Sequence, residues 1–307
     1  MIEKTWKGEG GNTMSLTVNI PKQDDKRETI RFLTLGIIIA VAALYIVAYF
    51  NLKHDVAKEN MLLNTVQGAN TQWKSSGKEF HLWSAISYFQ EEKTIGEQKV
   101  VTSSLKEKVS VLGNMESIVE ASILADSSYE DDGSKELLFF DPKTDYKNLP
   151  RELNMLADMN SNTMAEVALS FDKAYSLTEI EDILGSKHVN WMWVDTATDA
   201  ELQEMNMSLN EDNAYAGDTT IGFQVKGAGF VSHGQVFLDK LKKLSDDEAY
   251  RKEAELILSG INKSTFPSVK DIKVRGAVIS GTPEQLAAFM KVKMIKASTI
   301  GTKIHQI

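Results

Sequence analysis

The stretch FLTLGIIIAVAALYIVAYF, from Phe32 to Phe50, decides the architecture of this 307-residue chain. It contains no charged residue, and the uncharged run continues through Leu52. An α-helix rises about 1.5 Å per residue, so about 20 residues span a hydrocarbon core roughly 30 Å thick. We therefore predict a single transmembrane helix over residues 32–52. The length of the run and the absence of a polar face argue against the alternative, a buried core helix of a globular domain.

The basic residues on either side of this run predict its orientation. The N-terminal flank has four, whereas the C-terminal flank has two: Lys22, Lys26, Arg27 and Arg31 before the run, Lys53 and Lys58 after it. The more positive flank stays in the cytoplasm, so we expect a cytoplasmic N-terminus and an extracytoplasmic C-terminal portion. A cleaved signal peptide is the alternative, but its apolar core would be only about 7 to 15 residues long. We therefore expect an uncleaved signal anchor in the cell membrane.

Composition narrows the class of function. The net charge is −9, and because residues 1–52 contain six Lys or Arg and five Asp or Glu, the negative charge lies after the apolar run. An acidic body does not favour phosphate backbones, so we expect no nucleic-acid partner. The chain has no cysteine, which excludes disulfides, cysteine zinc ligands and a cysteine nucleophile. The five histidines are scattered, so we expect no metal site, and we expect no cofactor.

These patterns predict four segments. They are a short cytoplasmic tail (residues 1–31), the transmembrane helix (32–52), a membrane-proximal extracytoplasmic region (53–140) and an α+β C-terminal domain (141–307). The tail is too short and polar to form a core, so we expect it to be disordered. Residues 7–13 look like a translated ribosome-binding site, which makes Met14 an alternative start to Met1.

The membrane-proximal region has weaker local signals. We expect residues 56–73 to continue the helix for a turn or two, ended by Gly77. The other expectations are a strand-like segment at 80–89, a hairpin-forming region at 100–113, a strand or helix at 117–124, a turn at 126–133 and a strand at 135–140. The acidic run at 130–132 lacks the residue pattern of a calcium-binding loop and is expected to be solvated.

The C-terminal region repeats a strand–helix–strand pattern. The first unit comprises residues 165–171, 177–184 and 189–194, with a capping box formed by Ser176 and Glu179 at the start of its helix. The second comprises a strand at 273–280, a helix opening at Pro283 and a strand at 294–300. Two such units predict a ferredoxin-like sheet with helices on one face. The remaining predictions are a helix at 151–159, a Gly-rich strand at 221–231 and helices at 235–244 and 246–258.

Three groups of residues have both a functional and a structural interpretation. Trp191 and Trp193 emerge on one sheet face and could stack on a ligand, but core packing against a helix is the stronger interpretation. An enzyme would need Ser170, Asp172 and Asp195 near a base such as His188, yet no nucleophile-elbow sequence is present. The third group consists of glycines that match no phosphate-binding motif and are expected to allow turns: Gly222, Gly227, Gly229 and Gly234.

The residues from Lys135 to Lys303 resemble the C-terminal domain of the sigma factor regulator family of Gram-positive bacteria. The stretches that carry the resemblance are FDP with a following Tyr, EVALSFD with a following Tyr, WVDT, VISGT and KASTIG. The family-motif residues are Pro142, Tyr146, Glu166, Ser170, Phe171, Asp172, Tyr175, Trp193, Asp195, Gly281 and Gly301. The resemblance implies no catalytic, cofactor-binding or metal-binding residue among them.

The resemblance implies a membrane-anchored, non-catalytic regulator that restrains an extracytoplasmic-function sigma factor. Its partners would be the lipid bilayer and a sigma factor or a companion membrane anti-sigma protein. Anti-sigma proteins of this kind usually grip the sigma factor with a folded cytoplasmic domain, which the short tail here does not supply. An accessory sensor role is therefore as plausible as direct inhibition. The alternative is a surface-anchored extracytoplasmic module that binds a ligand or protein and is unrelated to transcription.

Overall fold

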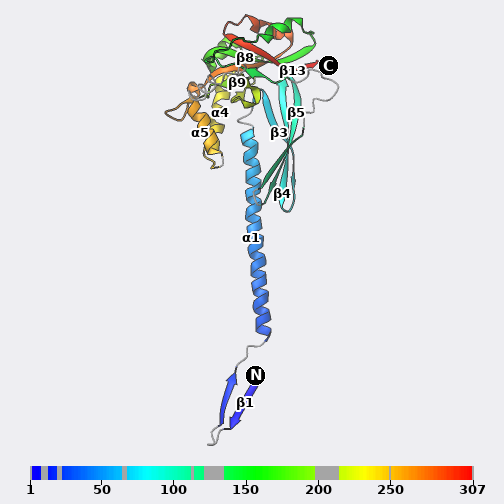
Figure 1. Ribbon diagram of the computed structural model, residues 1–307, viewed down its shortest axis with the longest axis vertical. Coiled ribbons are helices and arrows are strands. Elements are labelled where there is room, and N and C mark those ends of the chain that lie inside the picture. The colour runs from blue at the N-terminus through cyan, green and yellow to red at the C-terminus, as the bar shows by residue number, and fades with distance from the viewer. Residues whose placement is uncertain are drawn as a thin grey trace. The chain divides into compact units, whose positions relative to one another are not determined.

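The computed structural model describes residues 2–7, 13–18, 23–63, 68–111, 114–120, 135–197, 214–248 and 250–305. The chain forms two compact units, Met1–Lys53 and His54–Ile307. The first unit holds strand β1 (Ile2–Lys7), strand β2 (Thr13–Val18) and most of helix α1 (Gln23–Leu63) (Figure 1).

The expectation that residues 1–31 are disordered is wrong for the described part of this tail. Strands β1 and β2 pair antiparallel, with Ile2 opposite Val18 and Trp6 opposite Met14. Aromatic and β-branched residues favour the pleated conformation, although an isolated two-stranded hairpin is only marginally stable. Helix α1 already begins at Gln23, before the apolar run.

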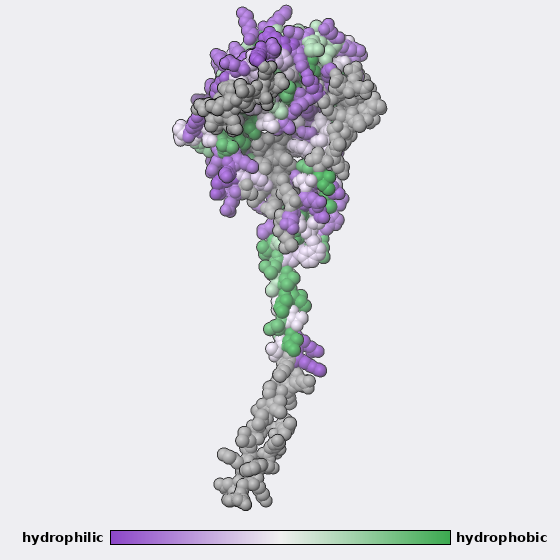
Figure 2. All heavy atoms as spheres, viewed as in Figure 1, coloured by the Kyte–Doolittle hydropathy of each residue, from purple (hydrophilic) through white to green (hydrophobic). Residues whose placement is uncertain are grey.

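The predicted apolar helix is confirmed, and it is longer than the apolar run itself. Within α1, Arg27–His54 is one span that is long and apolar enough to cross a membrane. Most of its large apolar side chains from Ile30 to Phe50 are exposed, and Figure 2 shows green, apolar surface along this segment. The helix extends to Leu63, as expected, but the prediction of helix at residues 71–73 is wrong because a strand begins at Thr71.

The second unit begins with a four-stranded antiparallel sheet. Its strands follow one another in sequence and in space: β3 (Thr71–Phe80), β4 (Ser84–Ile95), β5 (Gln98–Ser110) and β6 (Met115–Glu120). The predicted hairpin-forming region at 100–113 is confirmed: it forms most of β5, which pairs with β4 across a turn at Gly96, whose φ of 63° suits a two-residue hairpin turn, and with β6. The strand alternative for 117–124 is confirmed as far as Glu120, and the predicted turn at 126–133 lies outside the described residues.

The C-terminal sheet has five strands in the order β11-β9-β12-β8-β13, and every neighbouring pair is antiparallel. Helix α2 (Leu177–Leu184) connects β8 to β9, and α6 (Pro283–Leu286) followed by η5 (Ala287–Lys291) connects β12 to β13. The strands are β8 (Thr163–Ser176), β9 (Val189–Val194), β11 (Gly222–Gln224), β12 (Lys273–Gly281) and β13 (Ile295–His305). The mixed helix and sheet class is therefore confirmed.

The other elements differ from the predictions in extent or type. The helix at 151–159 is a 3₁₀ helix, η2 (Glu152–Asp158), and the strand at 135–140 shrinks to β7 (Leu138–Phe139), which pairs with β10 (Tyr215–Ala216). The predicted strand at 221–231 is wrong beyond Gln224, because helix α4 (Phe230–Ser245) begins within it. The remaining elements are α5 (Arg251–Ile261), η3 (Gly217–Thr219) and η4 (Val269–Asp271).

The C-terminal sheet has two different faces. Helices α2, α4 and α5 cover one face, where Phe171, Ile180 and Leu241 are fully buried in the main core (Figure 1). On the other face, Trp191 and Trp193 pack with Phe139 of β7. Core packing of the tryptophans is thus confirmed, but a helix does not cover them; the two-residue strands β7 and β10 do.

The capping box at the start of α2 is confirmed and carries a testable prediction. The Ser176 hydroxyl accepts a hydrogen bond from the backbone N–H of Glu179, and the Glu179 carboxylate accepts one from the backbone N–H of Ser176. Replacing Ser176 with alanine is expected to lower the free energy of unfolding by about 1 kcal/mol, measured by chemical denaturation. Ser176→Thr keeps the capping oxygen and should cost less; equal losses in both variants would contradict the capping role.

The same box has a predicted pH dependence. Hydrogen bonds from Ser176 lower the pKa of Glu179 below its ordinary value. A carboxyl group with a lowered folded-state pKa stabilises the protein above its unfolded-state pKa, and this contribution is lost as the pH falls through the folded-state pKa. The difference in stability between the wild type and Ser176→Ala should therefore shrink in acid.

Candidate functional site

A buried arginine lies on the tryptophan-bearing face of the C-terminal sheet. Arg275 belongs to β12, at a bulge where the register shifts between Val274 and Gly276. A bulge re-aims a side chain and bends the strand. The Arg275 guanidinium lies 4.4 Å from the ring centroid of Trp193 and 5.7 Å from that of Tyr215, and only 2% of its side chain is exposed.

Two carboxylates compensate the charge of Arg275. Its Nη1 forms an ion pair with the fully buried carboxylate of Asp141, and its Nε lies 3.3 Å from Oδ1 of Asp195. Lys143 Nζ lies 3.8 Å from the other oxygen of Asp195. A charge buried this deeply is tolerated only when it is paired. Arg275, Asp141 and Asp195 therefore form one ion-pair cluster.

Burial controls the titration of this cluster. It lowers the pKa of Arg275 to about 9, so the guanidinium keeps its positive charge at neutral pH. Burial also raises the pKa of Asp195, and the charge of Lys143 partly opposes this rise.

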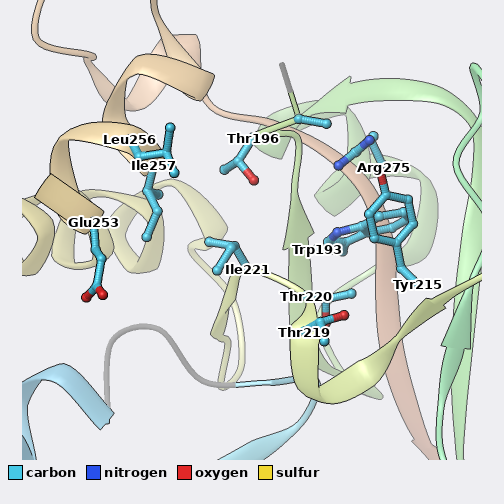
Figure 3. Close-up of a pocket in the computed structure, with 11 residues that line it drawn as sticks. Trp193, Thr196, Tyr215, Thr219, Thr220, Ile221, Glu253, Leu256, Ile257 and Arg275 are labelled. Carbon is cyan, nitrogen blue, oxygen red and sulfur yellow. The ribbon is translucent and has the colours of Figure 1, made fainter. Parts of the chain in front are cut away.

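A pocket of about 410 Å³ opens over this cluster (Figure 3). Arg275, Trp193 and Tyr215 line one side, and α5 supplies Leu256 and Ile257 on the other. The remaining lining residues are Thr196, Ala197, Thr219, Thr220, Ile221 and Glu253. Because two carboxylates already neutralise Arg275, the pocket suits a largely apolar group with a few hydrogen-bonding atoms better than an anion.

Three of the family-motif residues, Pro142, Tyr146 and Ser170, belong to or contact the segment that supplies Asp141. The hydroxyl of Tyr146 accepts a hydrogen bond from the backbone N–H of Asp141, and the ring packs edge-on against Phe140. The Ser170 hydroxyl accepts a hydrogen bond from the backbone N–H of Phe140, and Pro142 lies in the turn that follows. These contacts fix the segment against the sheet.

Three further family-motif residues, Phe171, Asp172 and Tyr175, contact one another near the C-terminal end of β8. The Tyr175 hydroxyl donates a hydrogen bond to Asp172, and its ring packs edge-on against the buried Phe171. Burial, together with this hydrogen bond, raises the pKa of Tyr175 to about 12. Asp172 thus lies within strand β8, next to Tyr175, and a turn at this position is not found.

A second buried charge cluster is centred on Glu166. One carboxylate oxygen accepts hydrogen bonds from Lys93 Nζ at 2.7 Å and from the backbone N–H of Thr302 at 3.1 Å. The other accepts a hydrogen bond from Asn70 Nδ2 at 2.8 Å. Since Lys93 belongs to β4 and Asn70 precedes β3, the cluster joins the four-stranded sheet to the C-terminal sheet.

Two motif glycines make room for neighbouring side chains. A Cβ at Gly301 would lie 2.6 Å from Leu137 Cδ2 and 2.8 Å from the Glu166 carboxylate. A Cβ at Gly281 would lie 2.7 Å from the Gln285 amide oxygen that caps α6. Both positions therefore favour glycine because no other side chain fits without a shift.

The residues considered for an enzyme lie apart. His188 directly precedes β9 and Asp195 directly follows it, so the strand separates them by about 20 Å. Ser170 and Asp172 are engaged with Phe140 and Tyr175, as described above. Burial lowers the pKa of His188. Within the residues that the structure describes, no cluster of three His, Asp or Glu side chains could hold a metal ion.

The sequence analysis did not identify the buried charge partners in either cluster. Arg275 and Asp141 were not identified as a pair, and neither were Lys93 and Asn70 as partners of Glu166. The available signal was a charged residue inside an otherwise apolar strand, as in KVRGAVIS and AEVALSF. A charge there must find a buried partner, but the pattern does not say which one.

The C-terminal part of the chain is similar to the sigma factor regulator family. Residues 156–302 match the family model described as "Sigma factor regulator C-terminal". The resemblance to the sigma factor regulator family is therefore confirmed for this region.

Part of the chain is also similar to one individual protein. The chain is 24% identical over 151 residues to the probable anti-sigma-M factor YhdL of Bacillus subtilis (strain 168). The match covers 48% of this chain and 41% of the relative, so the chain spans less than half of that protein's length. No solved structure matches the chain.

Proposed function

We propose that the protein is a membrane-anchored, non-catalytic regulator of an extracytoplasmic-function sigma factor. One combination of features carries this proposal: a sigma factor regulator domain at residues 156–302 in the same chain as the apolar helix span Arg27–His54. A regulator of this kind binds partners and needs no catalytic residue. The similarity to an anti-sigma factor supports a sigma factor, or a companion membrane anti-sigma protein, as the partner.

The topology belongs to the same proposal. The basic flank before the helix supports a cytoplasmic N-terminus and an extracytoplasmic body. We keep the boundaries 1–31, 32–52, 53–140 and 141–307 as proposed segments. The strand order β9-β12-β8-β13, with α2 and α6 in the two crossovers, supports the ferredoxin-like arrangement.

The experiment tests the partner and the regulon together. The full chain, carrying an affinity tag, is purified from host membranes, and its gene is deleted in parallel. We expect a sigma factor or an anti-sigma membrane protein to co-purify, and the regulon of that sigma factor to rise on deletion. A variant that lacks residues 2–21 is the matched control, because it keeps the basic flank, the helix and the body but loses most of the tail in which a cytoplasmic contact would lie.

The pocket over Arg275 favours a second candidate function. A pocket of about 410 Å³ with an aromatic wall and an apolar wall is typical of a ligand-binding site. The alternative is therefore a surface-anchored module that binds a ligand and has no link to transcription. Deletion that leaves every sigma regulon unchanged, with no sigma or anti-sigma partner recovered, would replace the first proposal with this one.

A further inference from the structure

Three large apolar residues cluster at the turn between β3 and β4. Phe80, Leu82 and Trp83 are 44%, 64% and 65% exposed, and we call these three residues the apolar tip. Folded proteins rarely present such a group to water, because solvating it is costly and it promotes association. The exposed part of this group is a candidate interaction surface.

The backbone holds the tip in a defined shape. The N–H of His81 donates a hydrogen bond to the carbonyl of Ser84 at 2.8 Å, which closes the turn. The N–H of Val111 donates to the carbonyl of Trp83 at 2.9 Å, so the end of β5 braces the same turn. The apolar side chains are consequently presented by the end of a four-stranded sheet.

The chemistry of the tip matches a membrane interface. Tryptophan and phenylalanine are favoured at the boundary between headgroups and acyl chains, and leucine adds apolar area. Cationic side chains that can meet lipid phosphates lie nearby: Lys78 and His81 on either side of Phe80, and Lys106 and Lys108, which pair with Tyr88 and Ile86 across β4 and β5. Glu79 and Glu116 offset part of this charge, so the apolar side chains supply the main attraction.

The chain between the apolar span and the tip is long enough for the tip to reach a bilayer. Helix α1 extends nine residues past His54, a rise of about 14 Å. The seven residues between Leu63 and Thr71 span at most about 25 Å when extended, and strand β3 adds about 33 Å before the tip. Because the tip and the apolar span belong to one chain, insertion of the tip is an intramolecular step, which lowers the interfacial affinity that it needs.

We propose that the apolar tip inserts into the interface of the bilayer that α1 enters, and that a lipid surface is its occupant. The β3–β4 turn is then a second, reversible membrane contact of the anchored body. This role does not depend on the sigma factor regulator function, because it rests on the tip and the apolar helix alone.

Because the chain contains no cysteine, a single introduced cysteine can be labelled specifically. Leu82→Cys is labelled with an environment-sensitive fluorophore in the full chain, reconstituted as one copy per nanodisc. Lipids that carry a quencher near the headgroup are then added to the nanodisc. The matched control is the same label at Val236→Cys, an exposed apolar position on α4.

We expect quenching at residue 82 and none at residue 236. Adding Phe80→Ser and Trp83→Ser should lower the ratio of inserted to free tip by about tenfold or more, because two large apolar side chains are lost. Absent quenching at residue 82, or equal quenching at both positions, would overturn the proposal. Quenching at residue 82 that appears only with two copies per nanodisc would also overturn it and assign the tip to a second copy of the chain.

Discussion

Replacing Arg275 with methionine is expected to lower the free energy of unfolding by about 3–5 kcal/mol. The substitution keeps much of the side-chain volume but leaves the carboxylate of Asp141 buried without its cation. It also removes the cation from the face of the Trp193 ring. Chemical denaturation followed by tryptophan fluorescence measures the change, since Trp191 and Trp193 lie in the same core.

A double variant separates the charge effect from the loss of packing. Arg275→Met combined with Asp141→Asn removes the charges of the buried pair and should recover most of the lost stability, because Asp141 then carries no charge and Asp195 keeps Lys143 as its partner. Lys143→Ala is the control, because the side chain of Lys143, which pairs with Asp195, is half exposed. This variant should lower the free energy of unfolding by less than about 1 kcal/mol. The buried ion pair would be refuted as a stabilising unit if Arg275→Met cost no more than Lys143→Ala.

Replacing Glu166 with alanine is expected to have an effect of similar size, about 3–5 kcal/mol. The Glu166 carboxylate is fully buried and accepts three hydrogen bonds, so its removal leaves the ammonium group of Lys93 and the amide of Asn70 without this acceptor. Because the cluster joins the two sheets, hydrogen exchange should also quicken at the backbone of β4. Denaturation and hydrogen-exchange mass spectrometry check the two expectations.

Glu166→Gln is the matched variant. Its side chain has the same shape and keeps one acceptor for Lys93 and Thr302, so it should cost clearly less than alanine. Its amide group would face Asn70 Nδ2, another donor, and a cost above that of an exposed substitution is still expected. Equal losses for the two variants, with no change in exchange at β4, would show that the cluster does not couple the sheets.

The elements that could be predicted from the sequence are those defined by neighbours along the chain. The capping box at Ser176 was correct because its hydrogen bonds join residues three positions apart. Strand β9 matched its prediction because six nearly continuous apolar residues suit a strand covered on both faces.

The errors fall where pairing partners decide the structure. Strand β3 has the polar sequence TQWKSSGKEF and no clean alternation, so it is a strand because β4 pairs with it. The region at 100–113 that was expected to form a hairpin is mostly a single strand, β5, which pairs with β4 along its length and with β6 from Ser104 to Val109. Local propensity is weak compared with such tertiary pairing.

By itself the sequence determined the apolar helix, the capped helices and the acidic, cysteine-free composition of the body. These features depend on transfer of side chains from water and on hydrogen bonds within a few residues, so they can be read along the chain. Only the tertiary structure decided that Arg275 meets Asp141 and Asp195, and that the Glu166 carboxylate meets Lys93 and Asn70. A buried charge requires a partner of opposite sign, but its position in the sequence is set by how the strands cross.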